Sequence, residues 1–136
     1  MRLVIQRVAQ AKVFDAAITN GLFILVGVGK GDTLEKAEKL AEKVSKMRLM
    51  ADKEGKMNLP AENFLVVSQF TLYADTTGGN RPSFLQAAPP QKASEVYEYF
   101  ISELKAKGVK VETGSFGDYM QIQALLDGPV TIILEN

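Results

Sequence analysis

The sequence predicts an α+β protein with mixed, mainly antiparallel β-sheets packed against two main helices. Two observations predict this class. Short β-rich apolar runs outnumber the segments with helical spacing, and the helices do not alternate regularly with the strands. The 136 residues are expected to form one domain, residues 1–136, because no repeat, low-complexity tract or long linker divides them.

Two strands are expected near the start of the sequence. Residues 3–10 alternate with the period of two that places successive side chains on opposite faces of a strand. Residues 21–28 form a short apolar run bounded by glycines, which is typical of a buried strand. Gly29 and Gly31 then end this second strand.

The first helix is expected over residues 33–50. Its apolar side chains recur at spacings of three and four and so share one face: Ala37, Leu40, Ala41, Val44 and Met47. Asp32 and Glu35 are expected to form a capping box at its start. Two ion pairs between residues four apart support the exposed side, Glu35–Lys39 and Glu42–Lys46. A polar turn is expected at residues 52–58.

The second half of the chain predicts four strands and a helix. Residues 64–73 are rich in β-forming side chains and predict a central strand. A second helix is expected to begin at Pro89-Pro90 and to end before Gly108. Its buried stripe is predicted to contain Ala93, Val96, Tyr97, Phe100, Ile101 and Leu104. Three closing strands are expected at residues 109–113, 119–126 and 130–134.

The composition excludes several kinds of active site. The chain has no histidine, which removes Ser-His-Asp and Cys-His triads, histidine metal sites and imidazole bases. It has no cysteine, so disulfides and thiolate metal sites are absent. An enzyme of this composition works with hydroxyls, carboxylates, lysines, backbone amides or groups of the substrate itself. We expect no metal and no cofactor.

The charge and the hydropathy of the chain limit the kinds of partner that it is expected to bind. Sixteen basic residues balance sixteen acidic ones, whereas proteins that wrap nucleic acid non-specifically carry a basic excess, so any RNA contact is expected to be local. Residues 35–56 hold seven Lys or Arg against five Asp or Glu, which is typical of a solvated helix and turn. No apolar run is long enough to cross a bilayer, and the first residues differ from a signal peptide. A cytoplasmic location with no membrane partner is expected.

The segment that follows the buried part of the central strand has two interpretations. Period two places Gln69 and Thr71 on the same face as Leu65 and Val67, so this face changes from apolar to polar. The strand then either emerges from the core into water, or directs an amide and a hydroxyl about 7 Å apart into a common pocket. In the second interpretation these two groups orient a small polar substrate.

Two later segments are also candidates. The loop at residues 78–84 connects a strand to a helix, and its Arg81 is the obvious partner for an anion. Asp127-Gly128 is typical of a hairpin turn, but Pro129 removes a backbone donor and requires an edge, a bulge or a special turn. A cis bond between Gly128 and Pro129 would direct two carbonyl groups outward.

Five segments together resemble the D-aminoacyl-tRNA deacylase family, also called the D-tyrosyl-tRNA(Tyr) deacylases. In order along the chain they are residues 2–8, 54–58, 66–72 (VVSQFTL), 81–84 (RPSF) and 128–131 (GPVT). The resemblance implies a hydrolase that cleaves the ester bond of D-aminoacyl-tRNA, and of glycyl-tRNA, and releases free amino acid and tRNA. It implies chiral proofreading in translation. The implied partners are the 3′ end of aminoacyl-tRNA and a second copy of the chain, with the sites at the interface of this homodimer.

The resemblance also assigns roles to particular residues. Ser68, Gln69, Phe70 and Thr71 are expected to line the aminoacyl pocket. Thr71 is expected either to act as a nucleophile or only to position the substrate, with backbone N–H groups near Phe70 and Thr71 binding it. The second of these roles is favoured.

A tip inserted from the partner subunit completes the site that the resemblance implies. Gly128 and Pro129 are expected to form this tip, to bind the α-amino group of the substrate through their carbonyls and to exclude L-amino acids. Arg7 is expected to hold the tip in place.

Two departures and two alternatives accompany the resemblance. Leu126 stands where the family usually has asparagine, so any polar contact made there is lost, and residues 13–21 are shorter than the usual hairpin, which affects an edge of the sheet. One alternative is an editing module that removes a wrong L-amino acid, as the similar N-terminal domain of archaeal threonyl-tRNA synthetases does. The other is a non-catalytic RNA- or protein-binding dimer with the same fold.

Overall fold

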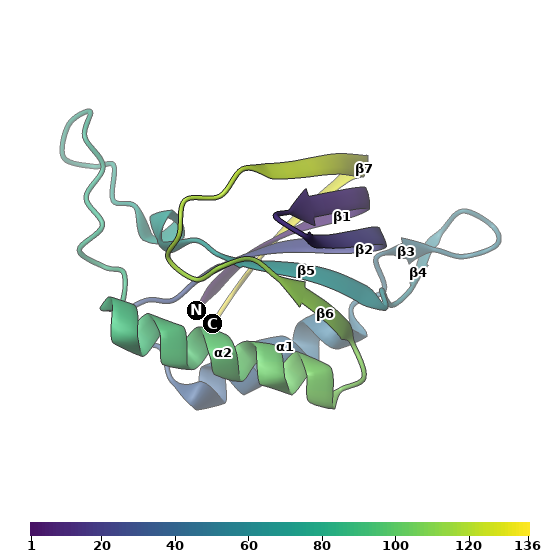
Figure 1. The fold of residues 1–136 in the computed structure, drawn as a ribbon, viewed down its shortest axis with the longest axis horizontal. Helices are drawn as coiled ribbons and strands as arrows, with labels where there is room; N and C mark the ends of the chain where they lie inside the picture. The colour runs from purple at the N-terminus through teal and green to yellow at the C-terminus, as the bar shows by residue number, and fades with distance from the viewer.

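A five-stranded mixed sheet is the framework of this computed structural model, which describes residues 1–136 (Figure 1). The strands are β1 (Arg2–Val13), β2 (Ala16–Gly27), β5 (Asn63–Ser68), β6 (Lys110–Thr113) and β7 (Ile122–Glu135). They lie in the order β6-β5-β2-β1-β7. β1 is antiparallel to β2 and to β7, whereas β5 is parallel to β2 and to β6.

Two helices cover one face of the sheet (Figure 1). They are α1 (Leu34–Lys46) and α2 (Pro90–Ala106). A two-stranded hairpin of β3 (Met50–Ala51) and β4 (Met57–Leu59) projects from the sheet. The predicted α+β class, with its mixed sheet and two main helices, is confirmed. Neither helix is long and apolar enough to span a membrane.

Apolar clusters form on both faces of the sheet because β2 and β5 are apolar on both sides. The larger cluster includes Leu22, Ile24, Phe64 and Val66 and is closed by the helices. The predicted stripe of α2 contributes Val96, Tyr97, Phe100 and Leu104, all buried. The smaller cluster is built from Val8, Ala11, Val13, Ile18, Phe23, Leu65 and Val67. β5 therefore lies in the middle of the core, and its C-terminal end is held firmly.

The first helix differs from its prediction at both ends. Thr33 is the N-cap and accepts a hydrogen bond from the Lys36 N–H at 3.3 Å, so the capping box predicted from Asp32 is wrong. Asp32 is instead buried and bound elsewhere. The helix ends at Lys46 rather than at residue 50, because Met50 pairs with Leu59 in the β3–β4 hairpin.

The end of the chain is one strand rather than a hairpin. The predicted strand at residues 130–134 lies within β7, and that at 119–126 does so from Ile122 onward; both parts of β7 pair with β1. Two register shifts in β1, at Gln6/Val8 and Val8/Gln10, accommodate the irregular segment around Gly128 and Pro129. Pro129 therefore lies at a bulge in an edge strand, where its missing N–H removes no ladder bond.

The short connection after β1 does not weaken the sheet. A two-residue turn at Phe14 and Asp15 joins β1 to β2, and Phe14 has a positive φ of 50°. The two strands pair from Arg2↔Gly27 to Val13↔Ala16. β1 and β2 thus form one long, continuous hairpin.

Asp32 is the only buried charged side chain, with 5% of its surface exposed. Its carboxylate accepts hydrogen bonds from the Met1 amino group, from the Gly29 N–H at 2.7 Å and from the Tyr73 hydroxyl at 3.2 Å. Burial alone raises the pKa of Asp32, but the hydrogen bonds from the amino group and Gly29 outweigh burial, so the pKa is lowered. The folded state therefore favours the ionised carboxylate.

We predict that Asp32→Asn lowers the free energy of unfolding at neutral pH by about 2–3 kcal/mol, the upper range for hydrogen bonds to a charged group. Because the folded pKa of Asp32 lies below its ordinary value, this stabilisation is complete above the unfolded pKa and is lost as the pH falls through the folded pKa. Urea unfolding of both proteins over a series of acidic pH values measures the difference. Asp15→Asn, at the exposed β1–β2 turn, is the control. A gap between wild type and Asp32→Asn that stays constant with pH would contradict the prediction.

Candidate functional site

The candidate site begins where β5 ends. Ser68 is the last residue of the strand, and the Gln69 N–H donates to the Val26 carbonyl of β2 at 2.7 Å. A 3-10 helix, η1 (Phe70–Tyr73), follows immediately. The prediction of a strand to Tyr73 is therefore wrong, and so is the common face that period two assigned to Gln69 and Thr71.

Two glycines in and after β2 explain this early turn. A Cβ on Gly27 would lie 3.0 Å from the Leu72 Cβ, and one on Gly29 would lie 2.6 Å from the Tyr73 ring. These glycines leave space for η1 to pack closely on the end of β2. The Arg2 guanidinium lies 5.0 Å from the centre of the Tyr73 ring and donates to the Leu72 carbonyl. The C-terminal end of η1 is thus fixed by β1, β2 and Asp32.

Backbone donors at the start of η1 are available. No side chain caps this helix, and the first N–H groups of a helix have no partner within it. These groups belong to Phe70 and Thr71. The Thr71 hydroxyl donates to the Gln69 side-chain oxygen at 2.6 Å. The two side chains thus meet, although by a turn of the backbone and not by strand alternation.

A cavity of about 610 Å³ opens beside the start of η1. Its walls come from β2, the end of β5, the first residues of α2 and residues 116–120 before β7, and they are mainly apolar. Ser68, Gln69 and Phe70 line it, whereas Thr71 does not. Three of the four predicted pocket residues therefore share one cavity, and the fourth is hydrogen-bonded to one of them.

Several aromatic residues of this cavity were not predicted as site residues. Phe84 packs edge-to-face on Phe70 with ring centres 5.1 Å apart, and Phe116 and Tyr119 also line the cavity. Phe84 is part of the RPSF segment that carried the resemblance. Phe116 and Tyr119 lie on either side of Gly117 in the sequence. Glycine is typical of places where the backbone approaches a ligand closely, and this is the local signal that could have identified these two residues.

Arg7, in β1, contacts the residue that precedes Gly128. Its Nε donates to the Asp127 carbonyl at 3.1 Å and pairs with the Asp127 carboxylate at 3.1 Å. A second guanidinium nitrogen, Nη1, donates to the Leu49 carbonyl at 3.0 Å. The guanidinium therefore connects β1 to β7 at Asp127, the residue immediately before Gly128. It also connects β1 to Leu49, the residue immediately before β3.

The Gly128–Pro129 peptide bond is cis. Both residues are exposed on β7, and neither lines the cavity of Ser68 and Phe70. Arg81 is also exposed, in the loop before α2, and lies outside the cavity. A single chain therefore does not bring the expected tip to the expected pocket.

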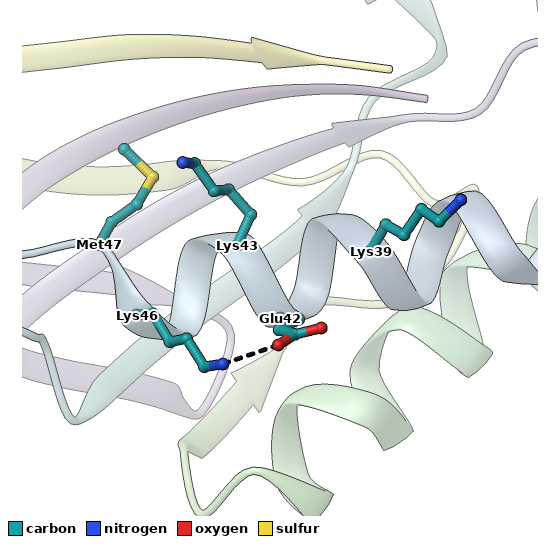
Figure 2. Close-up of a pocket in the computed structure, with 5 residues that line it drawn as sticks. All are labelled: Lys39, Glu42, Lys43, Lys46 and Met47. Carbon is teal, nitrogen blue, oxygen red and sulfur yellow. Dashed lines mark hydrogen bonds and ion pairs between the residues drawn. The ribbon is translucent and has the colours of Figure 1, made fainter.

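A second hollow lies on the flank of α1 (Figure 2). It measures about 330 Å³ and is lined by Lys39, Glu42, Lys43, Lys46 and Met47. None of the predicted site residues contributes to it. No group of three or more acidic side chains lies close enough to hold a metal ion.

Comparison with known proteins gives concordant results. A sequence model of the D-Tyr-tRNA(Tyr) deacylase family matches residues 4–135. The D-aminoacyl-tRNA deacylase of Thermotoga petrophila is 51% identical over the whole chain and 97% of its own length. That of Koribacter versatilis is 46% identical over the same shares. The alignments span 145 positions, more than the 136 residues of this chain, so relatives carry residues that it lacks.

Solved structures agree with the fold. A structure titled c-Myc DNA Unwinding Element Binding Protein has a TM-score of 0.93 and 34% identity, and the match covers all of this chain and 99% of that one. A probable eukaryotic D-amino acid tRNA deacylase has a TM-score of 0.84 at 16% identity, which supports the fold alone. The family model matches residues 4–135, and the two relatives are 51% and 46% identical over the whole chain. The resemblance is therefore confirmed: this chain belongs to the D-Tyr-tRNA(Tyr) deacylase family of hydrolases.

Proposed function

We propose that this chain hydrolyses the ester bond of D-aminoacyl-tRNA, and of glycyl-tRNA, and releases the free amino acid and the tRNA. The observation that carries the proposal is the cavity at the end of β5, where Ser68, Gln69 and Phe70 lie beside uncapped backbone donors. Removal of D-amino acids from tRNA is a proofreading step of translation, and its place is the cytoplasm.

The chemistry needs no histidine. An aminoacyl-tRNA is an activated ester with a neighbouring ribose hydroxyl, so its hydrolysis has a lower barrier than that of an amide. The N–H groups of Phe70 and Thr71 orient the ester carbonyl and stabilise the oxyanion that develops on it. One donor of this kind contributes about 2.7–4 kcal/mol in other enzymes. Main-chain donors therefore supply much of the catalysis.

Thr71 acts as a positioning residue in this proposal. Its hydroxyl is engaged with the Gln69 side chain at 2.6 Å and lies outside the cavity. A threonine nucleophile needs an adjacent base to remove its proton, and the chain has no histidine to serve as one. The hydroxyl instead holds Gln69 in place at the wall of the cavity.

The aromatic side of the cavity fits the terminal nucleoside of tRNA. Phe70, Phe84, Phe116 and Tyr119 present flat apolar surfaces on which a base can stack. The polar side chains in the cavity wall are Ser68, Gln69 and Asp118. A nucleoside stacked on the aromatic rings then has its acylated ribose near the start of η1.

A second copy of the chain completes the site. β7 is an edge strand, and it exposes Leu125, Leu126 and Ile133, with 62%, 46% and 64% of their surfaces accessible. Exposed apolar side chains along an unpaired edge are typical of an interface. Leu126, where the family usually has asparagine, strengthens the apolar character of this edge. A homodimer through β7 presents Gly128 and Pro129 of one copy to the cavity of the other.

A tip formed by Gly128 and Pro129 distinguishes D-aminoacyl from L-aminoacyl groups by their shape. When the amino group and the carbonyl of the substrate are held in fixed positions, exchange of the hydrogen and the side chain at Cα drives an L side chain into the tip. A D side chain points away, and glycine has no side chain to exclude. Binding of the α-amino group falls to the carbonyls of Gly128 and Pro129, while Arg7 holds the preceding carbonyl of Asp127.

We predict that the protein hydrolyses D-Tyr-tRNA at least about 100-fold faster than L-Tyr-tRNA, which corresponds to a steric clash of about 3 kcal/mol. Glycyl-tRNA is expected to be hydrolysed as well. Release of labelled amino acid from matched esters measures these rates. Faster hydrolysis of the L ester would indicate an L-editing module, and hydrolysis of neither ester would indicate a non-catalytic binding protein.

We predict that Arg7→Lys reduces the preference for the D ester by about tenfold. Lysine cannot donate to the carbonyls of both Asp127 and Leu49 in the forked geometry of arginine, so the segment before Gly128 loses its anchor. The ratio of the D and L rates is the measurement. Arg48→Lys, an equal change at an exposed position, is the control. An unchanged ratio in the folded Arg7 variant would show that this anchor has no part in selectivity.

We predict that Thr71→Ala retains activity within about tenfold of the wild type, because the hydroxyl only orients Gln69. Single-turnover hydrolysis of D-Tyr-tRNA measures the rate. Mass spectrometry of the wild-type protein quenched during turnover tests for a D-tyrosyl group on Thr71. Detection of that covalent intermediate would overturn the positioning role.

A further inference from the structure

The lysines of α1 form a row along one side of the helix. Lys36, Lys39, Lys43 and Lys46 follow one another at spacings of three, four and three residues, which places them on one face. The row, here called the lysine row, lies beside the buried face of Ala37, Leu40, Ala41 and Val44. The slight basic excess of residues 35–56 is therefore not spread evenly around the helix.

Two glutamates of α1 border the lysine row, since Glu35 pairs with Lys39 and Glu42 with Lys46. The hydrogen bond from Lys46 is the main cause that lowers the pKa of the Glu42 carboxyl, and the charge of Lys107, after the end of α2, adds to it. Figure 2 shows Lys39 and Lys43 extended away from α2, whereas Lys46 turns toward Glu42. Helix α1 carries four lysines against three glutamates, a small basic excess in a chain with no net charge.

The ion pairs of the lysine row do not prevent its lysines from binding an anion. Lys39 pairs with Glu35 and Lys46 with Glu42, and all four of these side chains are more than half exposed. Exposed pairs of this kind contribute little, so an anion can replace the carboxylates. Lys43 is exposed and makes no ion pair at all, and it borders the hollow of about 330 Å³ between Lys39 and Lys46.

The dimensions of the row fit a nucleic-acid backbone. Its four lysines lie within eleven residues of helix, and the rise from Lys36 to Lys46 is about 15 Å. One strand of a double helix places a phosphate about every 3.4 Å along its axis, so the row faces several phosphates. A regular polyanion therefore matches the row better than a single small anion does.

The row begins close to the candidate site. The Lys36 amino group lies 3.4 Å from the Asp32 carboxylate, which accepts from the Tyr73 hydroxyl at the end of η1. Phe70, at the other end of this short helix, lines the cavity, and four residues of 3-10 helix rise only about 6 Å between the first and the last. A tRNA with its 3′ end in the cavity can reach α1 directly.

We propose that the lysine row binds phosphates of the acceptor stem of the tRNA whose acylated 3′ end lies in the cavity. This inference rests on the proposed function for the identity of the RNA. It predicts that this chain of balanced charge binds an ester on tRNA more tightly than the same ester on a free nucleoside. The contact is electrostatic and independent of base sequence.

The test compares two triple variants of equal charge change. Lys39→Gln, Lys43→Gln and Lys46→Gln together remove most of the row and leave Lys36 on Asp32. Lys53→Gln, Lys56→Gln and Lys110→Gln remove three exposed lysines that lie outside α1. The measurements are KM and kcat for D-Tyr-tRNA, the same constants for the D-tyrosyl ester of adenosine, and the Kd of uncharged tRNA as a function of salt.

The row variant is expected to raise KM for D-Tyr-tRNA and Kd for tRNA by about tenfold, with kcat unchanged. The slope of log Kd against log salt should fall by about 2, because each lost phosphate contact removes about 0.7–0.9. The adenosine ester, which has no phosphate, should be hydrolysed at the wild-type rate. The control variant should change none of these quantities by more than about twofold.

Three outcomes would overturn the inference. They are an unchanged tRNA affinity in the row variant, an equal loss in the control variant, and a parallel loss of activity on the adenosine ester. Failure of the proposed function gives a different result, since the wild type would then hydrolyse neither D ester. The binding of uncharged tRNA would still report on the row in that case.

Discussion

The pairing of β1 with β2 on one side and β7 on the other is the constraint on which the rest of the structure depends. β1 is antiparallel to both neighbours over nearly its whole length, so it fixes the edge strand and the central strands in one register. β2 in turn fixes β5, whose end carries the candidate site. Arg7 lies at the irregular point of β1 and bonds to Asp127, so the bulge of β7 is set by the same strand.

Asp32 connects this framework to the site. Four donors converge on its buried carboxylate, from Met1, Gly29, Tyr73 and Lys36. A buried carboxylate is tolerated only when it is fully hydrogen-bonded, so these groups are held in one arrangement. Tyr73 ends η1, and the position of the backbone donors at its start follows from that arrangement.

The chemistry assigned to the cavity suits a protein without histidine. Backbone N–H groups and carbonyls do not depend on side-chain rotamers, and their positions are as precise as the strands that carry them. The cavity and the exposed Gly128-Pro129 segment lie apart in one chain. In the proposed dimer they meet, and the lysine row on α1 shares no residue with either of them.

The sequence by itself determined the class, the helices and the family, whereas only the tertiary structure decided the ends of elements and the roles of Asp32 and β7. Helix α2 was predictable because its stripe, its proline start and Gly108 are local features. The end of β5 was not, because η1 depends on Gly27, Gly29 and Asp32, which lie far earlier in the chain. Asp127-Gly128 is locally typical of a hairpin, yet Arg7, 120 residues away, and pairing with β1 hold it within one strand. Local preference is weaker than such long-range bonds wherever the two conflict.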